Sequence, residues 1–214
     1  MAKFVSQHRS LLGLSLIAAA LIALVIAGTA SAGKEAPTPE LPGPDNNQEC
    51  AHLDPVTLEV VGIGIFEADL HGSVAARTEE SFFGDGGRKT VPLEILGTVS
   101  RDYVEGLGEI IVSLDHSRPV KGSLLVEQTV GSEFPASQHM RFHIQIEIEA
   151  HPGVLYRSIE PLHVVSDRVK SFPPPNGTEY RLQAPIELED VANPGTVALR
   201  VLTGAPTIIG SKPA

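Results

Sequence analysis

The chain has 214 residues, of which 42% are hydrophobic, and it carries 16 basic and 26 acidic side chains for a formal net charge of −10. This balance argues against nucleic acid as a partner, because binding to a phosphate backbone depends on Lys and Arg side chains that release counterions. A chain of this length can bury a sizeable core, and its single cysteine excludes an internal disulfide.

Residues 1–32 have the layout of a secretory signal peptide. Lys3 and Arg9 precede an apolar run over residues 11–28, and Ala30-Ser31-Ala32 supplies the small residues that a signal peptidase reads. We therefore predict cleavage after Ala32 and a secreted protein, periplasmic or extracellular, with no membrane insertion. The apolar run is also just long enough to span a bilayer, so an uncleaved signal that anchors the protein in the cell envelope is the alternative.

Residues 33–51 predict a linker. Four prolines between residues 37 and 44 interrupt any helix or strand ladder, and most of the other side chains are polar. Cys50 lies in this segment. Because an unpaired thiol in an oxidising compartment can form an intermolecular bond, a dimer linked through Cys50 is a hypothesis.

Residues 52–209 show the period of two that is typical of half-buried strands. In Arg141–Ala150, apolar side chains alternate with polar ones along the whole segment. Tyr180–Leu188 repeats this pattern, and Pro185 within it indicates an edge strand or a bulge. Further strands are predicted at Val56–Val61, Ile65–Arg77, Val91–Val99, Glu109–Asp115, Ser123–Val130, Leu155–Ile159, Leu162–Ser166 and Thr196–Thr203.

Many short strands separated by turns rich in Gly and Pro predict an all-β fold. Half-solvated alternation argues against a parallel sheet, which would be buried on both faces. No segment keeps a helical period over three turns. We therefore predict an antiparallel β-sandwich of about 8–10 strands with little helix over residues 52–209, followed by a tail at 210–214.

Phe82 and Phe83 are the candidate binding residues. They adjoin the turn Gly84-Asp85-Gly86-Gly87, so two large apolar side chains lie near a predicted loop tip. The alternative interpretation is that one ring packs on the sheet and the other covers the end of the hairpin. As a contact surface, the pair would serve an unidentified protein or a surface polymer.

His143, Glu147 and His163 are the candidate metal ligands. On a strand, His139 and His143 would lie about 13 Å apart, too far to share an ion. His143 and Glu147 share a strand face, and His163 is a candidate cross-strand partner. We expect no cofactor, with a transition metal at these residues, or a structural calcium at an acidic turn such as the one at Asp85, as the alternatives.

The sequence contains no strong catalytic motif. The Gly-x-Ser-x-Gly elbow is absent, and the adjacent residues Asp115-His116-Ser117 point in different directions, so they cannot form a catalytic triad. Glu147 and Glu149 share a strand face at about 7 Å, a spacing that suits paired carboxylates.

The leading functional hypothesis is an exported, non-enzymatic module with a structural or binding role in the cell envelope or outside the cell. One alternative is an exported hydrolase that uses a metal or paired carboxylates on the face of His143 and Glu147. Another is a signal-anchored envelope protein whose β domain stands off the membrane on residues 33–50.

Overall fold

The computed structural model describes residues 40–213, so the predicted signal peptide and the first part of the predicted linker lie outside the described residues. The described chain is nearly all β-structure, with one short 3-10 turn at Asp85–Gly87. No helix within residues 40–213 is long and apolar enough to cross a bilayer. The strands are β1 (Asp45–Val60), β2 (Gly64–Thr78), β3 (Phe82–Phe83), β4 (Lys89–Val104), β5 (Gly108–Leu114), β6 (Ser123–Thr129), β7 (Ser132–Phe142), β8 (Ile144–Ile148), β9 (Leu155–Ser158), β10 (Leu162–Val169), β11 (Arg181–Leu182), β12 (Ile186–Asp190) and β13 (Val197–Pro213).

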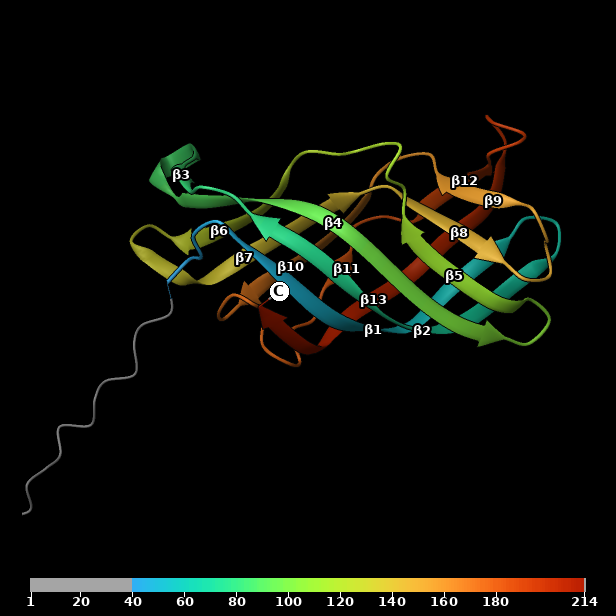
Figure 1. Ribbon diagram of the computed structural model, residues 1–214, viewed down its shortest axis with the longest axis horizontal. Coiled ribbons are helices and arrows are strands. Elements are labelled where there is room, and N and C mark those ends of the chain that lie inside the picture. The colour runs from blue at the N-terminus through green and yellow to red at the C-terminus, as the bar shows by residue number, and fades with distance from the viewer. Residues whose placement is uncertain (1–39, 214) are drawn as a thin grey trace, which may run out of the picture. The chain divides into compact units, whose positions relative to one another are not determined.

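The sheet closes on itself (Figure 1). Hydrogen-bonded neighbours run in the order β5–β4–β2–β1–β13–β12–β9–β8, and β8 pairs again with β5, for example through Ile146 and Val112. These strands form an eight-stranded antiparallel barrel. The prediction of an all-β antiparallel fold with little helix is confirmed, but the sheet forms a barrel rather than the predicted sandwich.

Four long strands are shared by two rings of the barrel. β1, β2, β4 and β13 have 16, 15, 16 and 17 residues. At one end β5, β8, β9 and β12 complete the ring, and at the other end β6, β7, β10 and β11 do so. Residues next to β11 join this second ring to β13, since the N–H of Tyr180 donates to the carbonyl of Pro206 at 2.7 Å.

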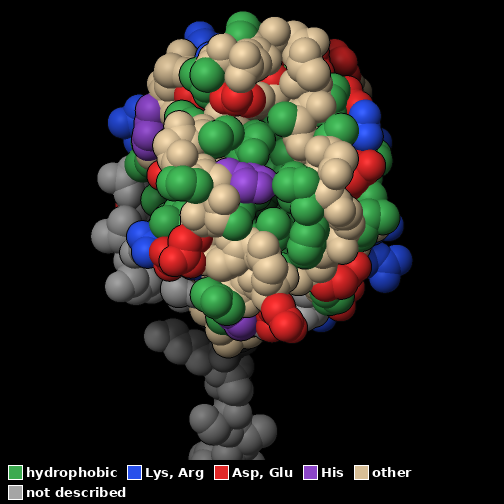
Figure 2. Space-filling model, turned by 90° about the vertical axis from the view of Figure 1, so that its right-hand side faces the viewer, with side chains coloured by type: hydrophobic (Ala, Val, Ile, Leu, Met, Phe, Trp, Pro, Cys, Tyr) green, Lys and Arg blue, Asp and Glu red, His purple; other side chains and the backbone are tan. Residues whose placement is uncertain are grey.

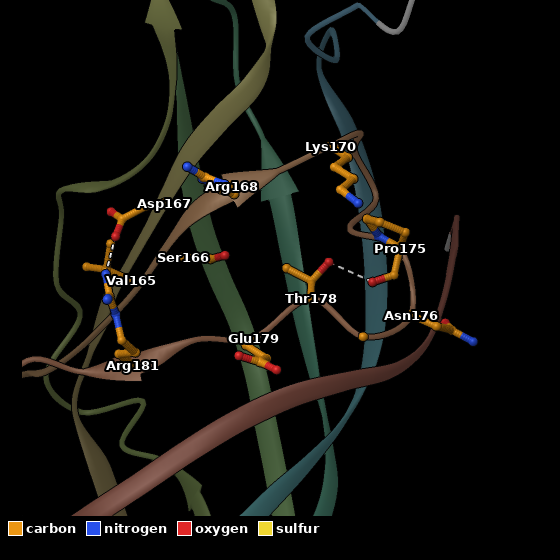
Figure 3. A pocket seen from close by; sticks show the side chains of 11 residues that line it. Val165, Ser166, Asp167, Arg168, Lys170, Pro175, Asn176, Thr178, Glu179 and Arg181 are labelled. Carbon is orange, nitrogen blue, oxygen red and sulfur yellow. Dashed lines mark hydrogen bonds and ion pairs between the residues drawn. The ribbon is translucent and has the colours of Figure 1, made fainter.

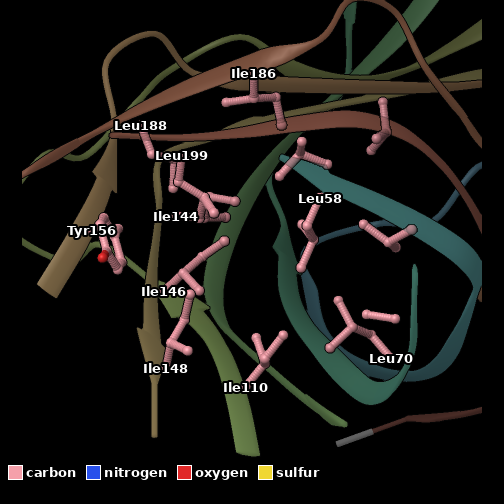
Figure 4. Close-up of a cluster of buried hydrophobic side chains, with 14 of the residues drawn as sticks. Leu58, Leu70, Ile110, Ile144, Ile146, Ile148, Tyr156, Ile186, Leu188 and Leu199 are labelled. Carbon is pink, nitrogen blue, oxygen red and sulfur yellow. The ribbon is translucent and has the colours of Figure 1, made fainter. Parts of the chain in front are cut away.

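One large hydrophobic core fills the barrel. In β8 the side chains of Ile144, Ile146 and Ile148 are buried and the intervening side chains face outward, so the predicted alternation of this segment is confirmed. Figure 4 shows these residues and others of the core, such as Leu58 on β1 and Leu70 on β2, pointing into the barrel from opposite walls. A smaller cluster lies in the second ring and consists of Leu41, Val91, Leu93, Leu125, Ala136 and Val169.

The β domain extends beyond the predicted bounds of 52–209. β1 begins at Asp45, so the last part of the predicted linker is a strand, and β13 continues to Pro213 through most of the predicted tail. Cys50 is in register with Ser73 on β2. Its backbone therefore belongs to the barrel wall and not to a linker, while the dimer through its thiol stays a prediction.

Bulges and one close backbone approach let the long strands coil around the core. The pairing of β1 with β2 shifts register between Leu53 and Val56, where Pro55 would otherwise interrupt the ladder. Gly72 on β2 lies so close to Val99 and Ser100 on β4 that any Cβ at this position would overlap their atoms. Only glycine permits this approach.

Candidate functional site

A cavity of about 90 Å³ lies inside the barrel. Its wall is contributed by both rings and is overwhelmingly apolar. The lining includes Ala51, Leu58, Leu70, Met140, Ile146 and Val164. Figure 4 shows several of these side chains converging on the barrel interior. A closed barrel of this size can hold one small ligand, and an apolar wall favours an apolar one.

A buried polar pair lies beside this cavity. Tyr180, which lines the cavity and is fully buried, donates its hydroxyl hydrogen to Oε1 of Gln138 at 2.8 Å. Gln138 is also fully buried and lies on the inward face of β7, two residues from Met140. Its Nε2 has no hydrogen-bond partner among the described residues. A buried amide N–H without an acceptor lowers the stability of the fold, because it has lost its hydrogen bonds to water and gained none in return.

The aromatic pair predicted as a contact surface is exposed. Phe82 and Phe83 form the two-residue strand β3, which pairs with Thr90 and Lys89 at the start of β4. Their exposed fractions are 49% and 77%. Neither ring is buried in the sheet, so the geometry leaves both accessible, and their role in binding stays a prediction.

His143, one of the predicted metal ligands, is held in a hydrogen-bonded network. It lies at the break between β7 and β8, and its Nδ1 is 2.8 Å from Nη2 of Arg118 and 3.0 Å from Oγ of Ser158. Because a guanidinium can only donate, Nδ1 of His143 must accept. Burial, followed by the charge of Arg118, lowers the pKa of His143 below its ordinary value.

Asp115 anchors the other side of this network. Burial alone would raise the pKa of Asp115, but hydrogen bonds from the hydroxyl and backbone N–H of Ser117 and from Arg118 outweigh it and hold the pKa below its ordinary value. His116 is exposed. The sequence pattern drew attention to Asp115-His116-Ser117 but missed Arg118, which connects Asp115 to His143 and to the backbone carbonyl of Ser158.

The other two predicted metal ligands lie elsewhere. Glu147 is on the exposed face of β8, and Nε2 of His163 on β10 is 3.4 Å from Nδ1 of His139 on β7. Within residues 40–213, no three His, Cys, Asp or Glu side chains converge on one point that a metal could occupy. Of the paired carboxylates, Glu149 accepts from the backbone N–H of Glu109 at 2.9 Å and thereby supports the β4–β5 turn.

A surface cleft of about 390 Å³ lies beside β10 and the segment that follows it (Figure 3). Arg168, Lys170 and Arg181 line it together with Asp167 and Glu179. Figure 3 shows Arg181 paired with Asp167, which is an exposed ion pair. The cleft therefore presents mixed charges rather than a concentrated basic surface.

The end of the barrel in Figure 2 carries the turns that join β1 to β2, β4 to β5, β8 to β9 and β12 to β13. Hydrophobic side chains gather near the middle of this face around a histidine, with acidic side chains beside them. The exposed large hydrophobic residues at or next to these turns are Val61, Ile63, Ile65, Tyr103 and Val191. An apolar molecule that approaches this end of the barrel would contact these exposed apolar side chains.

The comparisons with known proteins support the fold alone. No family model matches the chain, and no curated protein matches it. Among solved structures, the chain is similar to DynF from the dynemicin biosynthesis pathway of Micromonospora chersina, at 22% sequence identity and a TM-score of 0.63. The match covers 83% of this chain and 86% of DynF.

Proposed function

We propose that this protein is a non-enzymatic binding protein that holds a small apolar molecule inside its barrel. The observation that carries the proposal is the cavity of about 90 Å³ inside the barrel, with its apolar wall. Transfer of apolar surface from water into such a space is favourable without any charged contact. Met140 in the wall has a flexible side chain, which lets the cavity adapt to the shape of a ligand.

The polar pair beside the cavity gives this ligand a second expected property. Ligand sites of this kind combine an apolar wall with a few placed polar groups that orient the ligand. Tyr180 is the fully buried polar side chain that lines the cavity, and its hydroxyl hydrogen goes to Gln138, which does not itself line the cavity. The Tyr180 oxygen can still accept, so an apolar molecule with one hydrogen-bond donor at its end suits this arrangement.

The proposal includes export. The basic, apolar and small-residue segments of residues 1–32 support a secreted, periplasmic or extracellular location, or an envelope-anchored one if the signal is retained. A carrier outside the cytoplasm would need to deliver its ligand. The exposed rings of Phe82 and Phe83 are the surface we assign to contact with a receiving protein or surface polymer.

Reducing the cavity tests the proposal. Ala51 lines the cavity and is 4% exposed, so Ala51→Leu adds apolar volume where the ligand would lie. We expect the wild-type chain to bind xenon or benzene, small probes that enter dry apolar cavities, with binding followed by the NMR chemical shifts of the lining residues. Ala51→Leu should weaken this binding at least about tenfold, because overlap of a few atoms in a packed site costs about 1–3 kcal/mol.

Ala75→Leu is the matched control, since Ala75 lies on β2 and does not line the cavity. The control should bind xenon or benzene as the wild-type chain does, and far-UV circular dichroism should show both variants folded. If folded Ala51→Leu and wild-type chains bind these probes equally well, or if neither binds, the cavity is not a ligand site.

A further inference from the structure

A cleft of about 630 Å³ lies beside β4, under the connection that joins β5 to β6. β6 pairs with β4 up to Leu93, and β5 pairs with it from Val99 onward, so residues 94–98 of β4 lie opposite residues 114–122. Among the described residues, no strand pairs with 94–98 on this side. The longer segment bulges away from the shorter one, and the cleft is the space between them.

Part of the cleft wall is apolar. Ile95 and Leu96 contribute to it from β4, Val120 from the connection and Phe142 from the end of β7. Leu96 is one of the exposed large hydrophobic residues of the chain. A cleft of this volume, with apolar side chains and a few placed polar groups, is typical of sites for small organic molecules.

His143 offers a hydrogen-bond donor to this cleft. Arg118 can only donate, so its contact with Nδ1 of His143 at 2.8 Å places the ring hydrogen on Nε2. Nε2 has no hydrogen-bond partner among the described residues and is not a buried atom in that state, so it is open to solvent. Because His143 lines the cleft, its N–H is available to a ligand there.

Lys121 and Arg141 line the same cleft, and neither has an ion-pair partner among the described residues. The backbone N–H of Arg141 donates to Oγ of Ser123 at 2.8 Å. A Cβ built at Gly122 would lie 3.9 Å from Cδ of Arg141, so the Arg141 side chain runs beside the residue that follows Lys121. Neighbouring segments therefore bring two positive charges to the cleft.

Most of the carboxylates that line the cleft are already paired. Asp115 accepts from Arg118, and Glu94 forms an ion pair with Arg77 on β2. Glu79 is the lining carboxylate without an ion pair among the described residues. The two unpaired cations therefore outweigh the unpaired acid, on a chain whose formal net charge is −10. This balance favours an anionic ligand.

We propose that the cleft binds a small organic carboxylate with an apolar body. Arg141, Lys121 and the Nε2–H of His143 donate to the carboxylate oxygens, since hydrogen bonds between charged partners are the strong ones. The apolar body packs against Ile95 and Leu96. This site is distinct from the cavity inside the barrel and does not depend on the function proposed for that cavity.

NMR titration of the full chain with benzoate tests the proposal, with benzyl alcohol as the uncharged counterpart. We expect benzoate to shift the Nε2 signal of His143 and the amide signal of Gly122 in a saturable manner. Benzyl alcohol should bind at least about tenfold more weakly, because it lacks the charge that the donors recognise. Inorganic phosphate should also bind more weakly, because it has no apolar body.

Arg141→Gln and Lys121→Gln should each weaken benzoate binding at least about threefold, since each removes a charged donor. Glu79→Gln should strengthen it, because a like charge is removed. Arg168→Gln and Lys170→Gln are the matched controls. They remove the same charges from the cleft beside β10 and should leave the affinity for benzoate unchanged. Circular dichroism checks that each variant is folded.

The absence of saturable shifts in the tens of millimolar benzoate overturns the proposal. Equal affinity for benzyl alcohol or for inorganic phosphate also overturns it, as do equal losses in the two control variants. Ala51→Leu separates this site from the interior cavity. Loss of benzoate binding in that folded variant would place benzoate inside the barrel and overturn the proposal, whereas unchanged binding supports a separate site even if benzene and xenon do not bind.

Discussion

At the residue scale, the network around His143 makes stability depend on pH. The pKa of His143 is lower in the folded chain than its ordinary value of 6.5, so the unfolded chain takes up this proton more readily. We expect the free energy of unfolding to fall as pH drops below about 6.5, with a further fall below about 4, where the unfolded chain protonates Asp115 while its lowered pKa keeps it ionised in the folded chain. Urea denaturation followed by circular dichroism at stepped pH values measures the free energy of unfolding across both pH ranges.

The variant His143→Gln isolates the contribution of His143 to the loss of stability below about pH 6.5. It should flatten the slope between about pH 7 and 5.5, leaving the part that His163 contributes through its own lowered pKa. His116→Gln serves as the control, because His116 is exposed and should leave the slope unchanged. An identical slope in wild type and His143→Gln would show that His143 titrates alike in the folded and unfolded chains.

Single residues were predicted well where the information is local. Alternation along Arg141–Ala150 identified Ile144, Ile146 and Ile148 as buried, because successive side chains of a strand face opposite ways. The partners of His143 were not predictable in this way. Arg118 and Ser158 lie 25 and 15 residues away along the chain, and only the fold brings them to the imidazole.

At the scale of elements, the approach of β2 to β4 depends on one missing side chain. Gly72→Ala places a Cβ against the backbone of Val99, so these paired strands must separate locally. We expect this variant to lose about 1–3 kcal/mol of unfolding free energy, the range for overpacked sites. Chemical denaturation measures the loss, with circular dichroism as the signal because the chain has no tryptophan.

Gly97→Ala is the matched control for this prediction. Gly97 also lies in the β2–β4 pairing, opposite Ala75, but a Cβ there meets no atom within 4 Å. Its variant should be close to wild type in stability. Equal losses in the two variants would mean that the flexibility of the glycine backbone, and not the close approach at Gly72, determines the effect.

Most strands were predictable as elements, but their lengths were not. Ile65–Arg77 and Glu109–Asp115 were identified within a few residues of β2 and β5. The first part of β1 was assigned to a linker because four prolines precede it and most of the side chains of residues 33–51 are polar. The structure accommodates Pro55 at a bulge, a tertiary feature that a local pattern does not report.

At the scale of the whole molecule, the sequence pattern could not predict that the sheet closes into a barrel. A sandwich and a barrel share the same alternation and the same turns, and they differ in whether the first and last strands of the sheet meet. Here closure depends on β5 pairing with both β4 and β8, and on two rings sharing four long strands. The cavity exists because of this closure, so the candidate ligand site was equally unpredictable.

The second ring closes through a thin seam, defined as residues 177–182 with the facing part of β13. Its backbone hydrogen bonds run from Gly177 to Ile208, from Tyr180 to Pro206 and from Ile208 to Thr178, whereas β1 and β2 pair along nearly their whole lengths. Leu182 and Gly204 line both the cavity and a groove on the outside of the barrel. At these two residues the cavity and the outer groove lie on opposite sides of the same wall, and the few hydrogen bonds of the seam favour local opening there.

Amide hydrogen exchange tests this role of the seam. We expect the amide of Tyr180, although bonded to Pro206 at 2.7 Å, to exchange faster than the amide of Leu58 in the β1–β2 pairing, because opening the seam breaks few contacts. An apolar ligand that binds the closed barrel should slow exchange at Tyr180 by its occupancy, whereas Leu58 should respond only through global stability. Equal exchange at both amides, or equal slowing by ligand, would assign the entrance to another part of the barrel, such as the apolar end in Figure 2.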